Sequence, residues 1–172
     1  MNYKEKLNHI NTFIFDVDGV LTDGTVTLFP NGEQIRKMNT RDGYAIQYAI
    51  KKGYRIAVIS GGSSKGVEQQ LNYLGLADVY LGCSDKVKSF SELVQKHQLN
   101  TDHVLYMGDD LPDREVMQQV GLPTCPQNAA TEIKQIAEYI SPLNGGVGCV
   151  RDVIEQTLRA QGVWAEKNEL GW

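Results

Sequence analysis

The sequence predicts an α/β fold built on a doubly wound parallel sheet. Two observations support this prediction. Short apolar runs rich in β-branched residues alternate along the chain with longer segments whose apolar residues recur at helical spacing. The apolar runs also end repeatedly in Gly, Ser or Asp, as buried strands do where they leave a sheet for a loop. Because the connections between these segments are short, the chain is expected to form one domain, residues 1–172.

The composition narrows the class of protein. Hydrophobic residues make up 41% and charged residues 22% of the chain, which is ordinary for a globular protein. The net charge of -4 gives no broad basic field, so we expect no nucleic-acid partner. We expect no membrane association, because the sequence contains neither a long apolar span nor an apolar secretory signal. The three cysteines form no zinc or disulfide pattern, which favours a cytoplasmic location.

The prediction of a functional site starts from the first expected strand, residues 13–15. A polar lead-in, residues 1–11, precedes it, and Asp16, Asp18 and Gly19 follow it. In a parallel α/β sheet, ligands bind just beyond the carboxyl ends of the strands, so two carboxylates stand where a site would form. Held close together, these carboxylates would repel each other, and without a cation one of them would tend to bind a proton.

A β-hairpin is expected directly after this loop, over about residues 24–38. Apolar and β-branched residues flank Asn31-Gly32, a pair that is typical of the turn of a hairpin. A two-stranded hairpin is only marginally stable alone in water. We therefore expect the hairpin to pack against another surface, such as a second subunit.

Strands and helices alternate over the remainder of the chain. Further strands are expected at residues 55–60, 78–81, 103–107, 122–125 and 139–140. Helices are expected around residues 44–52, 67–74, 87–94, 116–120, 133–137 and 150–158. The segment 39–43 reads as a polar loop, 144–148 as a flexible glycine loop, and 162–172 as a polar tail with exposed-looking aromatic residues.

Polar side chains follow four of the expected strands, at the point where each strand ends. They are Asp16 and Asp18, then Ser60, then Lys86, and finally Asp109, Asp110 and Asp113. Each residue alone has an ordinary structural explanation, such as a turn, a helix cap or an exposed charge. Their occurrence in this order at successive strand ends instead favours one shared site.

These motifs resemble the four motifs of the haloacid dehalogenase superfamily. The narrower combination resembles the phosphatases without a cap domain that hydrolyse 3-deoxy-D-manno-octulosonate 8-phosphate. It consists of residues 15–24, the hairpin, Asn39-Thr-Arg-Asp-Gly43, Asp85-Lys86, Gly145-Gly-Val-Gly148 and Arg151-Asp152. The resemblance covers nearly the whole chain. It implies a Rossmann-like sheet with no cap domain and a Mg²⁺-dependent phosphoric monoester hydrolase of cell-surface glycan synthesis.

The resemblance also implies a role for each matching residue. Asp16 would be the nucleophile that forms an aspartyl-phosphate, and Asp18 the general acid and base. Mg²⁺ would be held by Asp16, the backbone carbonyl of Asp18 and Asp109, while Asp110 and Asp113 orient the ligands. Ser60 and Lys86 would bind the phosphoryl oxygens. The residues expected to bind the rest of the substrate are Asn39, Thr40, Arg41, Asp42, Gly43, Gly61 and Lys65.

The chain departs from the family pattern at three positions. Gly62, Gln70 and Val147 stand where the resembling phosphatases usually carry arginines that bind the sugar acid. Neither glycine nor glutamine can replace the bidentate contact of an arginine with a carboxylate. Lys65 and Arg41 are the nearby candidates for that contact. The departures leave open a second substrate class, the nonulosonate 9-phosphates related to sialic acid.

Two alternatives lie outside the phosphatase class. A non-catalytic binding or assembly module with this fold would not need Asp16, Asp18, Lys86 and Asp109. A mutase would need Asp16 and Asp18, but also a cover that excludes water, and no cap insertion is visible between the motifs. In the resembling family, hairpins join four subunits and a neighbouring subunit covers each site. We therefore expect a homotetramer in which residues after Gly145 approach another subunit's site.

Overall fold

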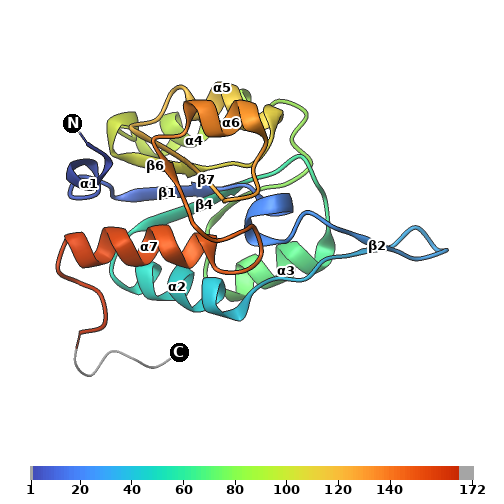
Figure 1. The fold of residues 1–172 in the computed structure, drawn as a ribbon. Helices are drawn as coiled ribbons and strands as arrows, with labels where there is room; N and C mark the ends of the chain where they lie inside the picture. Colours follow the sequence, from blue (N-terminus) through green and yellow to red (C-terminus); the bar gives the residue numbers. More distant parts are fainter. Residues whose placement is uncertain (1, 167–172) are drawn as a thin grey trace.

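The computed structural model describes residues 2–166, which form a parallel sheet with helices on both faces (Figure 1). The six strands lie in the order β5-β4-β1-β6-β7-β8, and every neighbouring pair is parallel. Their bounds are β1 Thr12–Phe15, β4 Arg55–Ile59, β5 Asp78–Tyr80, β6 Val104–Met107, β7 Leu122–Cys125 and β8 Tyr139–Ile140. The predicted doubly wound α/β fold is confirmed, and no cap domain interrupts the described part of the chain.

The central strand is β1, whose four residues are all buried. Phe15 pairs with Val58 of β4 on one side and with Met107 of β6 on the other. The strand order reverses at β1, because the chain first builds outward through β4 and β5 and then returns to place β6 on the opposite side. Ligands of doubly wound sheets bind where the order reverses, so Asp16 follows the strand at the expected binding position.

Helices cover both faces of the sheet in two layers (Figure 1). One layer contains α2 (Thr40–Lys51), α3 (Lys65–Tyr73) and α7 (Cys149–Ala160), and the other contains α4 (Lys86–His97), α5 (Arg114–Met117) and α6 (Thr131–Ile136). Successive strand residues point to opposite faces, so Phe13 and Phe15 join the core under α2 and α7, while Ile14 joins the core under α4. Short helical turns complete the fold: α1 (Tyr3–Lys6), η1 (Val17–Leu21), η2 (Thr101–His103) and η3 (Leu111–Asp113).

One loop prediction, at the start of α2, is wrong. The polar segment 39–43 is not a loop, because α2 already begins at Thr40. The Oδ1 atom of Asn39 accepts hydrogen bonds from the backbone N–H of Arg41 at 2.8 Å and of Asp42 at 3.4 Å, and so caps the helix. The polar lead-in, to which the sequence assigned no secondary structure, contains the single turn α1, which Asn2 caps.

The hairpin forms a separate two-stranded sheet that extends away from the body of the molecule (Figure 1). Its strands are β2 (Thr27–Leu28) and β3 (Gln34–Ile35). The turn lies where it was predicted: Asn31 Oδ1 accepts from Glu33 N at 3.0 Å, and Gly32 has a φ of +84°, which favours glycine. Exposed apolar side chains cover the hairpin, with Leu28 70% exposed and Val26, Phe29 and Ile35 also exposed.

The tail is folded back onto the chain as far as it is described. The ring of Trp164 packs 5.0 Å from that of Tyr48 in α2, and the guanidinium of Arg151 lies 5.4 Å from the Trp164 ring. The prediction that this aromatic residue is exposed is therefore wrong, since α2 and α7 offer it an apolar surface. The rest of the predicted tail, residues 167–172, lies outside the described residues.

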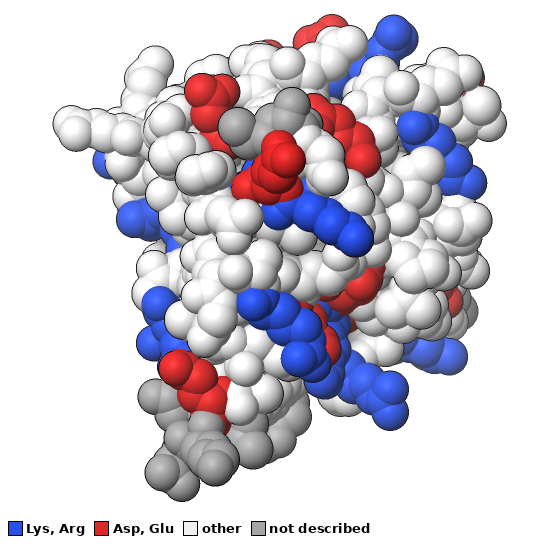
Figure 2. Space-filling model, turned by 60° about the vertical axis from the view of Figure 1, so that its left-hand side comes forward, with Lys and Arg blue, Asp and Glu red and all other residues white. Residues whose placement is uncertain are grey.

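Within residues 2–166, none of the helices is sufficiently long and apolar to span a membrane. Figure 2 shows the molecule turned so that the left-hand side of Figure 1 comes forward. Acidic and basic side chains are interspersed over this face. This face therefore carries no broad surface of a single charge.

Candidate active site

Asp16 leaves the central strand with its side chain buried. Its backbone N–H still belongs to the sheet, because it donates to the carbonyl of Met107 at 3.1 Å. Its carboxylate has two different partners: Oδ1 accepts from Val17 N at 2.7 Å, and Oδ2 lies 3.1 Å from Nζ of Lys86. One oxygen is thus held by the backbone while the other faces a cation.

Lys86 connects Asp16 to a second buried carboxylate, Asp113. Lys86 Nζ donates to Asp113 Oδ1 at 2.7 Å, and the hydroxyl of Tyr106 donates to the same oxygen at 2.6 Å. The other oxygen, Oδ2, accepts from the backbone N–H of Asp109 at 3.1 Å and of Asp110 at 3.4 Å. Both oxygens of Asp113 are therefore engaged, which suits a residue that orients its neighbours.

Asp109 lies against the loop that follows β1. A Cβ atom added to Gly19 would lie 2.0 Å from Asp109 Oδ2, so only a glycine allows this approach, and Gly19 also has a φ of +87°. Carboxylate oxygens of Asp16, Asp109 and Asp113 all lie within 4.8 Å of one another. Residues from the ends of two neighbouring strands thus form one acidic cluster, as the sequence predicted for Asp16 and Asp109.

The electrostatics of this cluster indicate a shortage of positive charge. Burial and the charge of Asp113 together raise the pKa of Asp16 to about 6, while Lys86 opposes the shift. Burial and the charges of Asp16 and Asp113 raise the pKa of Asp109 to about 7. Burial alone would lower the pKa of Lys86, but the charges of Asp16 and Asp113 outweigh it and leave that pKa raised. A further cation beside Asp16 and Asp109 would relieve the repulsion, and their hard oxygen donors fit Mg²⁺.

Ser60 follows β4, the neighbour of β1, and is buried. Its Oγ accepts a hydrogen bond from Gly62 N at 3.3 Å, and its backbone carbonyl accepts from Cys83 N at 3.0 Å. Gly61, next to it, is exposed. The structure therefore places this hydroxyl on a strand end adjacent to that of Asp16, as predicted.

Asp18 has a partner that the sequence did not indicate. Arg36, just beyond β3 of the hairpin, donates from Nε to Asp18 Oδ1 at 2.6 Å and from Nη2 to Asp18 Oδ2 at 3.0 Å. This bidentate ion pair joins the hairpin to the loop after β1. Nothing in the local pattern distinguishes Arg36 from the other polar residues of the hairpin, so only the tertiary structure reveals the contact.

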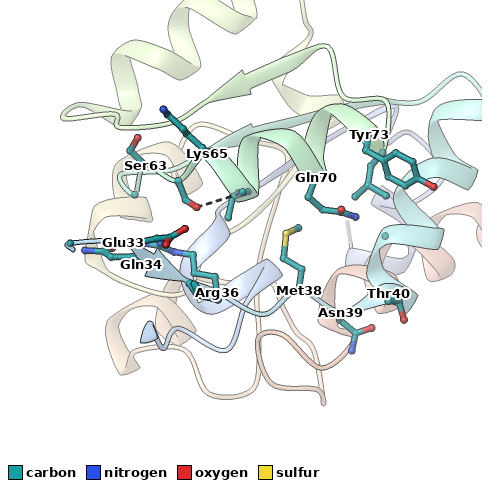
Figure 3. Close-up of a pocket in the computed structure, with 18 residues that line it drawn as sticks. Glu33, Gln34, Arg36, Met38, Asn39, Thr40, Ser63, Lys65, Gln70 and Tyr73 are labelled. Carbon is teal, nitrogen blue, oxygen red and sulfur yellow. Dashed lines mark hydrogen bonds between the residues drawn. The ribbon is translucent and has the colours of Figure 1, made fainter. Parts of the chain in front are cut away.

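A pocket of about 1180 Å³ opens between the hairpin, the start of α2 and α3. Figure 3 shows Arg36 and Met38 along one wall, with Lys65, Gln70 and Tyr73 on the other. Of the residues predicted to bind substrate, Asn39, Thr40, Gly43 and Lys65 line this pocket. Arg41, Asp42 and Gly61 do not line it.

Asp42 has a structural position rather than one in the pocket. Its carboxylate is buried and accepts from the backbone N–H of Arg151 at 2.8 Å, which fixes the start of α7 against α2. Burial raises the pKa of Asp42 to about 6, against smaller opposing effects of its backbone hydrogen bonds. The side-chain N–H of Asn39 makes a similar link to the carbonyl of Gly146 at 3.3 Å. These contacts do not support the predicted contact of Asp42 with substrate.

Comparisons with known proteins agree with the class of enzyme that this geometry indicates. A family model described as haloacid dehalogenase-like hydrolase matches residues 76–154. The chain is 40% identical over 157 residues to the 3-deoxy-D-manno-octulosonate 8-phosphate phosphatases of Salmonella typhi and Escherichia coli K12, covering 91% of this chain and 84% of each relative. The chain belongs to this phosphatase family, so the predicted resemblance is confirmed.

Solved structures of the family have the same fold. The phosphatase from Yersinia pestis superimposes with a TM-score of 0.91 at 37% identity, covering 93% of this chain and 86% of that one. The phosphatase from Moraxella catarrhalis, solved in complex with a magnesium ion, a phosphate ion and a KDO molecule, gives a TM-score of 0.89 at 32% identity, covering 92% and 91%. The absence of a cap domain from residues 2–166 therefore accords with the fold of the family.

Proposed function

We propose that this protein is a Mg²⁺-dependent phosphatase that hydrolyses 3-deoxy-D-manno-octulosonate 8-phosphate to the free sugar acid and phosphate. The observation that carries the proposal is the contact between buried Asp16 and Lys86, at 3.1 Å, beside the crowded carboxylates of Asp109 and Asp113. The names of the relatives and the magnesium, phosphate and sugar acid bound to the Moraxella catarrhalis enzyme support the substrate and the metal.

Asp16 attacks phosphorus in this proposal, and the bond to the sugar oxygen breaks to leave an aspartyl-phosphate. Lys86 and Ser60 bind phosphoryl oxygens, and Asp113 with Tyr106 holds the ammonium group of Lys86 in place. Asp16, the backbone carbonyl of Asp18 and Asp109 would hold Mg²⁺, with Asp110 and Asp113 orienting them. The bound ion supplies positive charge that reduces the repulsion between an anionic nucleophile and an anionic phosphate.

Asp18 protonates the leaving oxygen of the sugar and later accepts a proton from the water that hydrolyses the aspartyl-phosphate. Its carboxyl group contacts Arg36, which lines the pocket. Because a sugar alkoxide is a poor leaving group, this residue should matter more for sugar phosphates than for p-nitrophenyl phosphate, whose leaving group needs little protonation.

Phosphate release from a panel of substrates, with and without Mg²⁺, tests the function. The panel contains the octulosonate 8-phosphate, a nonulosonate 9-phosphate, mannose 6-phosphate and p-nitrophenyl phosphate. We expect the octulosonate ester to have the highest kcat/KM and chelation to abolish its turnover. A preference for the nonulosonate ester would contradict the substrate. Inactivity on every ester would contradict the phosphatase, and an isomerised ester without free phosphate would indicate a mutase.

We further propose a homotetramer assembled through the hairpin. The support is the apolar surface of the hairpin, where Leu28, Phe29 and Ile35 are exposed although most large apolar side chains among the described residues are buried. Light scattering at micromolar concentration should give about four times the chain mass, and a single 19.2 kDa species would contradict the assembly. Leu28→Asp should dissociate the tetramer, whereas the control Tyr73→Asp, at an equally exposed position outside the hairpin, should not.

We also propose a cytoplasmic location. All three cysteines, Cys83, Cys125 and Cys149, have free thiols, which supports a reducing compartment. Fractionation of cells that express the tagged protein tests this proposal, and recovery outside the cytoplasmic fraction would contradict it.

A further inference from the structure

The side chain of Arg36 is buried although the residue belongs to an exposed hairpin. Gln34 and Ile35 before it are exposed, yet the Arg36 side chain is only 6% exposed. Its Nε and Nη2 atoms bind the two oxygens of Asp18, and Nη2 also lies 3.4 Å from Oε1 of Gln34. The third nitrogen, Nη1, is buried and has no hydrogen-bond partner among residues 2–166. Leaving a charged donor buried without an acceptor is unfavourable, so an acceptor is expected from a ligand.

The place of Arg36 in the pocket indicates where that ligand binds. Arg36 and Gly62 both line the pocket, where Figure 3 shows the Arg36 side chain, and the guanidinium of Arg36 pairs with Asp18. A Cβ atom on Gly62 would lie 2.8 Å from Asp18 Oδ2 and 3.3 Å from Arg36 Nη2. A side chain at residue 62 would therefore require Asp18 and Arg36 to shift.

The other cations near the pocket are less well placed. Lys65 lines the pocket, but its side chain is exposed, and it is a flexible point charge. Arg41 is exposed and does not line the pocket. Arg36 alone among these three is held rigidly by an ion pair and retains free N–H groups on a buried nitrogen. A planar guanidinium with free N–H groups is suited to a carboxylate.

We propose that Arg36 is the specificity-determining residue that binds the carboxylate of the sugar-acid substrate through Nη1. The hydrogen bond from Arg36 Nε to Asp18 Oδ1 fixes the guanidinium, while Asp18 Oδ2 carries the proton that passes to the leaving oxygen, so the carboxylate end of the substrate is positioned relative to the general acid. This inference rests on the proposed function, because it assigns a recognition role within the same site.

The test compares Arg36→Gln with the wild type in the presence of Mg²⁺. Substrates are the octulosonate 8-phosphate, mannose 6-phosphate, which has no carboxylate, and p-nitrophenyl phosphate. We expect kcat/KM for the octulosonate ester to fall by roughly 10- to 100-fold, mainly through KM, with changes below about threefold for the other two. The free sugar acid should also inhibit hydrolysis of p-nitrophenyl phosphate less strongly in the variant, with an inhibition constant raised by a similar factor. Lys37→Gln, an adjacent loss of charge, should leave all values unchanged.

Two results would overturn the inference. An unchanged KM for the octulosonate ester would exclude the carboxylate contact. An equal loss on all three substrates would show that Arg36 acts on the phosphoryl group or through Asp18 instead. If the wild type itself ignores the octulosonate ester but hydrolyses the others, the proposed function fails, and inhibition by the free sugar acid still decides the role of Arg36.

A second variant, Arg36→Lys, tests the inference if Arg36→Gln does not fold or assemble. Arg36→Lys retains the charge but loses the planar group, so it should show the same selective loss at smaller size. Thermal unfolding and light scattering on both variants identify effects on the hairpin itself. A loss with Arg36→Lys that is no larger for the octulosonate ester than for mannose 6-phosphate would also overturn the inference.

Discussion

Buried acids lie at both ends of the strands of the central sheet, but their surroundings differ. Basic side chains outnumber the acid at the amino end, and acids outnumber the basic side chain at the carboxyl end. At the amino end, Asp78 begins β5 and is surrounded by bases: Arg55 Nη1 lies 3.1 Å, Lys96 Nζ 2.8 Å and His97 Nε2 2.9 Å from its carboxylate. Burial acts to raise the pKa of Asp78, but the hydrogen bonds and charges of His97 and Lys96 outweigh it and leave the pKa lowered.

At the carboxyl end of the sheet, by contrast, carboxylates outnumber the cations that pair with them. Asp16, Asp109 and Asp113 form one cluster, and among the described residues Lys86 is the cation that makes ion pairs with it. Burial and mutual repulsion raise the pKa of both Asp16 and Asp109. The comparison shows that buried charge alone does not identify a functional site. A buried carboxylate that is paired with cations stabilises the fold. Buried carboxylates that outnumber their cations favour the binding of a positively charged ligand.

The largest difference between the two ends should appear in turnover. We expect Asp16→Asn to reduce kcat with p-nitrophenyl phosphate by on the order of a thousandfold or more, because an amide is a poor nucleophile at phosphorus. The metal-free variant should unfold at the same temperature as the wild type or higher, since a repelling charge is removed. A variant that keeps a tenth of the wild-type rate would contradict the role of Asp16.

Asp78→Asn should show the opposite behaviour. We expect it to lower the free energy of unfolding by about 1 to 3 kcal/mol, because it replaces a buried, charged acceptor shared by three basic side chains with a neutral amide that can accept fewer of their hydrogen bonds. Its kcat/KM should stay within about twofold of the wild type. Urea unfolding measures the first effect, with Lys96→Gln, which removes a solvent-exposed partner, as a control expected to change the free energy of unfolding much less. A large loss of turnover would show that the two ends are not independent.

The two ends should also respond oppositely to acid in the metal-free protein. Asp109 has a raised pKa in the folded state, so its destabilising effect is full above about pH 7 and disappears as the pH falls toward the unfolded value of 3.8. Asp78 has a lowered pKa, so its stabilising effect is full above that value and is lost as the pH falls through the folded pKa. Asp109→Asn should therefore stabilise the metal-free protein at pH 7.5, by about 2 kcal/mol once its partial exposure is taken into account.

Urea unfolding of the wild type and Asp109→Asn at several pH values measures this effect. The stabilisation should shrink toward zero near pH 4, where the acid is protonated in the folded wild type. A variant that is less stable than the wild type at pH 7.5 would contradict the shortage of positive charge at the carboxyl end.

Metal binding should show the smallest of these effects. Mg²⁺ competes with protons for Asp16 and Asp109, whose pKa values are raised to about 6 and about 7. We expect the affinity for Mg²⁺ to weaken by about tenfold between pH 7.5 and pH 6. Calorimetric titration measures it, and Asp78→Asn should show the same dependence because the amino end does not bind the ion. An affinity independent of pH would argue against Asp16 and Asp109 as ligands.

Much of the fold and site follows from local sequence. Asp16, Ser60 and Asp109 could be placed because each follows a short apolar run, and parallel strands bring such ends together. The start of α2 was missed although Asn39 is a frequent helix cap, because the residues after it are polar and hide the helical period. That error made Asp42 look like a loop residue, when it is buried against α7.

Two contacts of the site could not be predicted from the sequence. Tyr106 lies inside an apolar strand and reads as a core residue, yet its hydroxyl binds Asp113. Arg36 lies in a polar hairpin, and its contact with Asp18 spans two elements whose relative position no local pattern fixes. Both depend on tertiary structure, because the partner is distant in sequence or the contact involves the end of a long side chain.

The open space at Gly62 has a consequence for the evolution of the family. Residues 36 and 62 share one small volume beside Asp18, since any side chain at 62 would approach both Asp18 and Arg36. A long basic residue can therefore enter that volume from the hairpin or from the strand end, but two such residues would crowd each other. Within the family, the identities of these two positions should covary, and a change at one should be tolerated best after a change at the other.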